Sequence, residues 1–217
     1  AALRQDDELL DLMTEQKISL SPREEALGET PLHKFVLLGM LDPVRTLVRH
    51  GADPNAYSTQ SGTTPLMDAI NENTLPVAEA LLEADADPNL RDIRFGNLPL
   101  HFCAVDNLTS ATVLLLRHGA DPNEVSITGL PPLHLAVSLG SVEVVRILLD
   151  AGADPKKPSG VGKTAFDVIE ARLAESANLQ TEKGVADLRR FRAVQELLED
   201  SMRRKQAAEI QPESPKP

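Results

Sequence analysis

The stretch Gly51-Ala52-Asp53-Pro54-Asn55 decides the fold, because close copies of it return along the chain at a nearly constant interval. The later copies begin at Asp85, Gly119 and Gly152, which gives spacings of 34, 34 and 33 residues. A period of this length is typical of proteins that stack one small supersecondary unit, because such a unit cannot bury its apolar face alone. The sequence therefore predicts a repeat architecture.

A second motif recurs in phase with the first and marks where a helix begins. It reads Thr30-Pro31-Leu32-His33, Thr64-Pro65-Leu66-Met67, Leu98-Pro99-Leu100-His101 and Pro131-Pro132-Leu133-His134, with Lys163-Thr164-Ala165-Phe166 as a degenerate fifth copy. A threonine hydroxyl at the N-cap accepts a backbone N–H, and a proline at the first helical position has no N–H to leave unpaired. Each copy is therefore predicted to start an inner helix.

A second amphipathic segment follows each inner helix. Val142, Val145, Leu148 and Leu149 recur at the three- and four-residue spacing that places them on one helical face. The glycine that opens most copies of the first motif supplies the left-handed residue that ends this outer helix. The Asp-Pro-Asn sequence then turns the chain, and the residues up to the next helix start are predicted to form an extended finger.

Both motifs, in this order and register, resemble the ankyrin repeat, whose unit is a β-turn followed by two antiparallel helices. The resemblance covers roughly residues 30–170. It implies an all-α fold, an ankyrin-repeat α-solenoid of helix-turn-helix units with projecting β-turn fingers.

The ends of the array are predicted to be modified caps, since terminal repeats have only one neighbour. Residues 1–28 are predicted to form an N-terminal capping half-repeat, and residues 29–160 four ankyrin repeats. Residues 161–205 are predicted to form a degenerate fifth repeat with a long C-terminal capping helix, and residues 206–217 a disordered tail. The capping helix carries one apolar stripe for docking on the last repeat, made of Leu188, Phe191, Val194, Leu198 and Met202.

Substitutions within the motifs predict where the array is weak. Met67 replaces histidine in the second copy, and Leu98 and Pro131 replace threonine in the third and fourth. The resemblance implies that this threonine and histidine share hydrogen bonds that tie adjacent repeats, so each of these three copies lacks one of the two hydrogen-bonding residues. Asp85 stands where the other copies have glycine, and a non-glycine residue in the left-handed region costs roughly 1 kcal/mol. We expect a moderately stable array whose weak point lies near Asp85.

Composition and charge restrict the classes of function. Of the 217 residues 41% are hydrophobic and 3% aromatic, so the core must be built from Leu, Ala and Val in thin layers. The formal net charge of -11 disfavours nucleic acid and anionic lipid as partners. The single cysteine, the lack of 18 consecutive apolar residues and an N-terminus without a signal-peptide pattern predict a soluble protein of a reducing compartment. The cytoplasm is the default, with the nucleus, the cilium or an organelle after processing left open.

The candidate catalytic and metal-binding residues all have a structural explanation. The five histidines fall at fixed repeat positions, so no metal-ligand spacing is left. Cys103 lies on an inner helix where the family has a small alanine, and no base stands beside it. Gly160-Val161-Gly162-Lys163-Thr164 resembles the end of a phosphate loop but has Lys157 where the first glycine belongs, so it is predicted to be a finger. We expect no enzyme activity, no cofactor and no metal.

What remains is a surface, which the resemblance places on the fingertips and the exposed flank of the inner helices. On the inner helices its candidate residues are Leu37, Leu38, Asn71, Glu72, Val105, Asp106, Ser138 and Leu139. Just before the helix starts they are Glu29, Thr63, Asn97 and Leu130. On the fingers they are Tyr57, Gln60, Arg91, Ile93, Arg94, Phe95, Val125 and Ile127.

The mixture of apolar and acidic side chains in this set predicts a partner protein segment with apolar and basic character. The sequence thus favours a non-catalytic protein–protein interaction module, an adaptor or scaffold that binds on its concave inner-helix and finger surface. The alternative is a structural subunit built permanently into a large assembly, such as a cytoskeletal, axonemal or organellar complex. That role calls for broad apolar patches on the outer helices as well, and the outer helices look ordinary.

Overall fold

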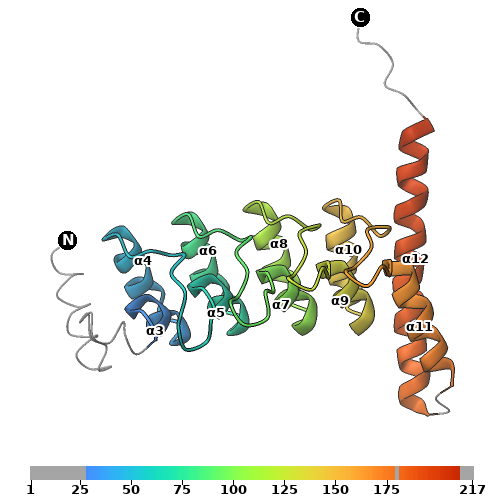
Figure 1. Ribbon diagram of the computed structural model, residues 1–217, viewed down its shortest axis with the longest axis horizontal. Coiled ribbons are helices and arrows are strands. Elements are labelled where there is room, and N and C mark those ends of the chain that lie inside the picture. The colour runs from blue at the N-terminus through green and yellow to red at the C-terminus, as the bar shows by residue number, and fades with distance from the viewer. Residues whose placement is uncertain (1–27, 179–180, 211–217) are drawn as a thin grey trace, which may run out of the picture. The chain divides into compact units, whose positions relative to one another are not determined.

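The computed structural model describes residues 28–178 and 181–210, and these residues form ten helices and no strand (Figure 1). The inner helices are α3 (Pro31–Leu37), α5 (Pro65–Asn71), α7 (Pro99–Asp106), α9 (Pro132–Leu139) and α11 (Ala165–Ala177). The outer helices are α4 (Leu41–Arg49), α6 (Leu75–Glu83), α8 (Thr109–Arg117), α10 (Val142–Asp150) and α12 (Glu182–Ile210). The predicted all-α fold is confirmed. The predicted N-terminal half-repeat falls, apart from Gly28, outside the described residues.

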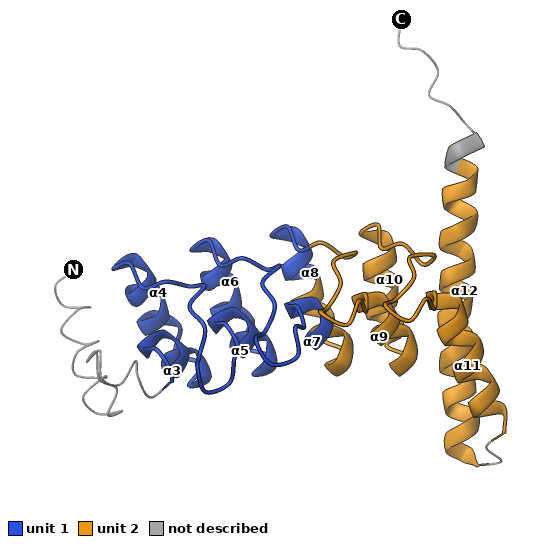
Figure 2. Cartoon of the chain, viewed as in Figure 1, with its two compact units in different colours: residues 1–102, 113–120 blue, residues 103–112, 121–217 orange. Residues whose placement is uncertain are grey.

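The chain divides into two compact units (Figure 2). Unit 1 contains residues 1–102 and 113–120, and unit 2 contains residues 103–112 and 121–217. The division runs through α7 and α8, so the units do not coincide with the repeat boundaries predicted from the sequence.

In unit 1, inner helices pack on inner helices and outer helices on outer ones. Helix α3 contacts α4 and α5, and α6 contacts both α4 and α5. The hydroxyls of Thr30 and Thr64 accept the backbone N–H groups of His33 and Met67, which confirms the predicted N-caps. The core is made mainly of aliphatic side chains with a single buried Phe35, as the scarcity of aromatic residues requires.

In unit 2 the same arrangement continues into the C-terminal cap. Helix α9 contacts α10 and α11, while α12 contacts both α10 and α11. The long helix α12 therefore takes the place of an outer helix. Its residues Phe191, Val194 and Leu198 are buried, whereas Leu188 and Met202 at the two ends of the predicted stripe are half-buried.

Helix α12 is longer than the sequence predicted. It continues to Ile210, whereas the tail was expected to begin at residue 206. The helix before it, α11, ends at Ala177, and α12 begins at Glu182. Residues 206–210 carry glutamine, two alanines, glutamate and isoleucine, which are good or acceptable helix formers, so an established helix propagates through them. Residues 211–217 lie outside the described part.

The helix ends use left-handed residues at two positions of each repeat. Outer helices end at Gly51, Asp85, Gly119 and Gly152, and the φ of Asp85 is +62°, so the predicted left-handed aspartate is confirmed. The corresponding residues after the inner helices are Gly39, Asn73, Asn107 and Gly140, all with positive φ. Asparagine tolerates this conformation better than most residues, which explains why the pattern is not visible as a glycine repeat.

The last residue of the Asp-Pro-Asn motif connects consecutive repeats. In unit 1 the side-chain nitrogen Nδ2 of Asn55 donates to the carbonyl of Asp85 at 3.1 Å, and the N–H of Asp87 donates to Asn55 Oδ1 at 2.8 Å. In unit 2 Asn123 makes the same pair of hydrogen bonds with Gly152 and Asp154, at 3.1 and 2.7 Å. The sequence suggested only a turn for this motif, so the inter-repeat role of its asparagine was missed.

The described residues include no helix with the length and apolar character needed to span a membrane.

Candidate partner-binding surface

The fingers of unit 1 are short turns closed by backbone hydrogen bonds. The N–H of Ser58 donates to the carbonyl of Thr63 at 2.9 Å, and the N–H of Asp92 donates to that of Asn97 at 2.8 Å. The buried Asp92 carboxylate also accepts the N–H groups of Phe95 and Asn97, at 2.6 and 2.8 Å. This aspartate therefore fixes the conformation of the finger that carries the largest exposed side chain of unit 1.

Neighbouring fingers of unit 1 are joined to each other. The N–H of Ile93 donates to the carbonyl of Gly62 at 2.8 Å, and the Arg94 guanidinium donates to the carbonyl of Gln60. With the backbone held in this way, the side chains of Ile93 and Phe95 stay 66% and 69% exposed. Covering two apolar side chains on a finger whose backbone is already held by hydrogen bonds would cost little backbone freedom.

The inner helices of unit 1 expose their C-terminal ends. Leu37 and Leu38 at the end of α3 are 41% and 51% exposed, and Asn71 and Glu72 at the end of α5 are exposed as well. The helices are only two turns long, so their last residues project beyond the packed layer while Leu32 and Phe35 fill it.

A buried carboxylate lies beneath this surface in unit 1. Asp68 on α5 is only 6% exposed, and its Oδ1 accepts the hydroxyl of Thr63 at 2.6 Å. The Thr63 hydroxyl is also 2.5 Å from the hydroxyl of Ser61. Burial, together with the nearby negative charges of Glu29 and Glu72, raises the pKa of Asp68 to about 6. The equivalent positions of the other three clear repeats hold Lys34, Phe102 and Leu135, so among the four clear repeats only the second has a carboxylate there.

In unit 2 the fingers approach each other so closely that only glycine fits at their contact. The N–H of Gly160 donates to the carbonyl of Gly129 at 2.8 Å. A Cβ atom on Gly160 would lie 2.1 Å from the carbonyl oxygen of Thr128. The Gly160–Lys163 segment is thus a finger, as predicted, and Thr164 after it is the N-cap of α11.

Apart from Val185 on α12, the large exposed apolar side chains described in unit 2 lie at the fingertips and on the inner helices. Ile127 and Val161 are 78% and 81% exposed, and Val105 and Leu139 are 51% and 40% exposed. Val161 was missed in the sequence, because the candidate finger residues were taken only from the three earlier fingers. Aligning Ser159 with Ser126 identifies it, since both serines precede a fingertip and accept a backbone N–H of the same turn.

The structure distributes the twenty predicted partner-binding residues over three classes of exposure. The exposed residues are Leu37, Leu38, Gln60, Asn71, Glu72, Arg91, Ile93, Arg94, Phe95, Val105, Asp106, Ile127 and Leu139. The half-buried residues are Glu29, Tyr57, Asn97, Val125, Leu130 and Ser138. Thr63 is buried, because its hydroxyl binds Asp68 inside unit 1. Thr63 therefore supports a neighbouring residue and offers no exposed group of its own.

Cys103 lies in the environment of a packed side chain. It is completely buried on α7, and burial raises the pKa of its thiol to about 12. The reactive thiolate form is therefore disfavoured at neutral pH.

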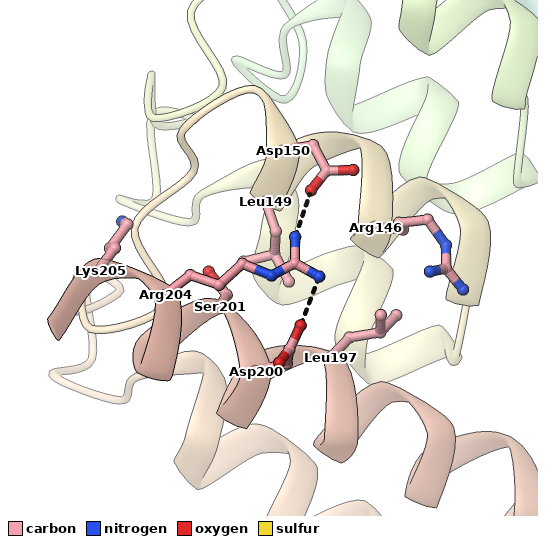
Figure 3. Close-up of a pocket in the computed structure, with 8 residues that line it drawn as sticks. All are labelled: Arg146, Leu149, Asp150, Leu197, Asp200, Ser201, Arg204 and Lys205. Carbon is pink, nitrogen blue, oxygen red and sulfur yellow. Dashed lines mark ion pairs between the residues drawn. The ribbon is translucent and has the colours of Figure 1, made fainter. Parts of the chain in front are cut away.

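A shallow groove of about 260 Å³ runs between α10 and α12 in unit 2 (Figure 3). Figure 3 shows the guanidinium of Arg204 between two carboxylates, at 3.6 Å from Asp150 of α10 and 2.5 Å from Asp200 of its own helix. The ammonium of Lys205 donates to the carbonyl of Ala153 at 3.4 Å. Because the cations of this groove are already engaged, its charges serve the docking of α12 on α10.

Comparison with known proteins identifies the repeat. The family model of ankyrin repeats (3 copies) matches residues 1–92 and 86–159, which together cover well over half of the chain. No curated protein matches the chain in a sequence search. Ankyrin repeats are in general protein–protein interaction modules, and the family is typically non-catalytic. The matched residues include both motifs in all four clear copies, and the chain belongs to the ankyrin-repeat family.

Proposed function

We propose that this chain is a non-catalytic adaptor or scaffold that binds a protein segment of apolar and basic character through its fingers and inner helices. One observation carries the proposal. Of the nine large hydrophobic side chains that are exposed in the described part of the chain, eight belong to the fingers or to the ends of the inner helices. The ninth, Val185, lies on α12. Single exposed apolar residues are normal on any protein, but their confinement to one kind of surface is not.

The same observation favours an adaptor over a permanently buried subunit. None of these nine side chains lies on α4, α6, α8 or α10. A subunit enclosed in a large assembly needs apolar contact area on more than one face, because obligate interfaces are larger and more hydrophobic than transient ones.

Charge supports a basic partner. Between residues 30 and 155 the sequence has 15 acidic and 7 basic side chains, a net charge of -8. Complementary charge accelerates encounter and selects between partners more than it adds affinity. We therefore assign the affinity to the apolar side chains and part of the selectivity to the carboxylates.

The test is a pull-down from native lysate, read by quantitative mass spectrometry, with variants that have first been shown by circular dichroism to be folded. The surface variants are Phe95→Arg and the double variant Leu38→Arg with Leu139→Arg. Val185→Arg is the control, because it introduces the same arginine on α12 at a valine that is as exposed as Leu38. A partner that is lost with the surface variants and kept with the control supports the proposal. Partners that return equally with all the chains would refute it.

A further inference from the structure

Among the described residues, Asp68 is the one deeply buried carboxylate of unit 1 that has neither an ion pair nor a hydrogen bond to each of its two oxygens. Its Oδ1 accepts the Thr63 hydroxyl, while Oδ2 has no hydrogen bond within the described part of the chain and keeps some contact with solvent. Asp92, the other buried carboxylate of this unit, binds two backbone N–H groups of its own finger, one with each oxygen. Asp92 thus has a structural role, whereas Asp68 has one carboxylate oxygen, Oδ2, that no group of the described chain binds.

The helices around Asp68 supply no compensating cation. Helix α5 itself adds Glu72, and Glu29 precedes α3, so both nearest charges are negative. Helix α3 carries His33 and Lys34, but neither acts on Asp68 as a charge partner, and α6 adds only the acidic Glu79 and Glu83. His33 is buried and its pKa is lowered by that burial, while its Nε2–H donates to the Thr63 carbonyl at 3.3 Å. His33 is therefore neutral and leaves the carboxylates uncompensated.

Keeping a carboxylate at position 68 lowers the stability of the folded chain, which an apolar residue at the same position would not do. A buried carboxylate without a cation destabilises the folded chain, as the raised pKa of Asp68 indicates. Phe102 and Leu135 at the equivalent positions show that the repeat accepts an apolar side chain there. The carboxylate is also close to the exposed end of α5, where Asn71 and Glu72 reach solvent.

We propose that Asp68, flanked by Glu29 and Glu72, receives a lysine or arginine side chain of the partner and so determines which apolar segments unit 1 binds. This inference rests on the proposed function and adds the chemistry of one contact to it. A cation placed beside Asp68 is attracted by its carboxylate and by the nearby negative charges of Glu29 and Glu72, while the Thr63 and Ser61 hydroxyls hold the acceptor in place. Apolar segments without the cation leave Asp68 uncompensated and bind less well.

The probe is a display library of random twelve-residue peptides, selected separately on the full wild-type chain and on Asp68→Asn, Asp68→Leu and Glu79→Gln. Asp68→Asn keeps the shape and a hydrogen-bond acceptor for Thr63, and Asp68→Leu copies the fourth repeat. Glu79→Gln is the matched control, because it neutralises an exposed carboxylate on the outer helix α6. We expect wild type and Glu79→Gln to select peptides with lysine or arginine at one fixed position, and both Asp68 variants to lose that preference.

The selected peptide is then measured by fluorescence anisotropy. We expect Asp68→Asn to weaken its binding about tenfold, and replacement of the peptide's basic residue by alanine to weaken wild-type binding equally, with no further loss when both changes are combined. Wild-type affinity is expected to fall between pH 7.5 and 5 as Asp68 takes up a proton, whereas the affinity of Asp68→Asn changes little. This comparison separates Asp68 from His33, which is present in both chains.

The outcomes distinguish the two claims. Peptides that bind through Phe95 or Leu38 but show no basic preference, or keep it in Asp68→Asn, would overturn the role of Asp68 and leave the proposed function standing. If none of the chains selects a peptide, both claims fail.

Discussion

Unit 1 and unit 2 are built from the same repeat but differ in the surface that they offer. The contacts that join repeats recur in both units. The side chain of Asn55 in unit 1 and that of Asn123 in unit 2 hydrogen-bond to the backbone of the following repeat. Both units also have fingers joined by backbone hydrogen bonds. The exposed positions do not recur. Unit 1 has a buried carboxylate with acidic neighbours, whereas unit 2 has Leu135 at the equivalent place and a long helix docked at its end. The fold therefore constrains one set of residues and leaves another free for recognition.

The largest expected effect is a loss of stability in unit 2 caused by a substitution in its C-terminal capping helix, α12. Phe191 of α12 is fully buried, and the guanidinium carbons of Arg172 and Arg190 lie 5.0 and 5.2 Å from its ring centre. Phe191→Ala should lower the free energy of unfolding by about 3–5 kcal/mol, because a large core side chain is lost. Hydrogen exchange should show faster exchange in α9 to α11 and little change in α3 and α4.

The control for this variant is Val185→Ala on the same helix, since Val185 is half-exposed and should change the stability little. Equal loss of protection in α3 and α4 would contradict the separate stability of the two units.

The next effect concerns the contact between the fingers of unit 2. Gly160→Ala should cost about 2–3 kcal/mol, because the added Cβ would overlap the carbonyl of Thr128 and force the fingers apart. Gly162→Ala in the same finger is the matched control, since a Cβ there meets no atom within 4 Å and only its positive φ is unfavourable. Urea unfolding measures both variants, and a Gly160→Ala chain as stable as Gly162→Ala would show that the fingers are not in contact.

The third effect is a pH dependence that belongs to unit 1. The pKa of Asp68 in the folded chain, about 6, lies above its ordinary value of 3.8. The stability that comes from the protonated form is therefore fully present below pH 4 and is lost as the pH rises through 6. Asp68→Asn should abolish this loss and make the chain about 2 kcal/mol more stable than wild type at pH 7.5, with no gain at pH 4. Urea unfolding at the two pH values checks this prediction. An equal gain in the free energy of unfolding at both pH values would contradict it.

The smallest effect compares the starts of α3 and α9. In unit 1, His33 Nδ1 lies 2.8 Å from the Thr30 hydroxyl, whereas in unit 2, where Pro131 replaces the threonine, His134 Nδ1 is buried and has no partner among the described residues. Pro131→Thr should restore this hydrogen bond and add about 1 kcal/mol of stability, and Thr30→Ala should remove about as much from unit 1. Thermal melting of both variants measures the two effects. A destabilised Pro131→Thr chain would mean that the rigidity of proline contributes more to stability than the restored hydrogen bond.

Much of the fold could be predicted because the repeat places particular residue types at the ends of its helices, where each of them acts locally. Threonine and proline at helix starts and glycine at outer-helix ends act locally, so their spacing revealed the helices and the strained Asp85. The inter-repeat clamp of Asn55 was not visible, because its partners lie about thirty residues away and become neighbours only after stacking.

The surface could be predicted by position and less well by chemistry. Most candidate positions are exposed because the repeat register fixes which side of a helix faces outward. Thr63 was misplaced because its burial depends on Asp68, a residue outside the familiar motif positions. Val161 was overlooked because the candidates were taken from the first three fingers, although Ser159 and Gly162 of the last finger align with Ser126 and Gly129 and make the same backbone hydrogen bonds.

The most direct test of the account is a hydrogen-exchange footprint of the full chain, free and in complex with the protein captured in the pull-down. Binding through the fingers and inner helices predicts slower exchange in residues 57–63, 91–97, 124–130 and 157–163 and at the ends of the inner helices, with α4, α6 and α10 unchanged. Slower exchange concentrated on those outer helices, with unchanged fingers, would contradict the central claim.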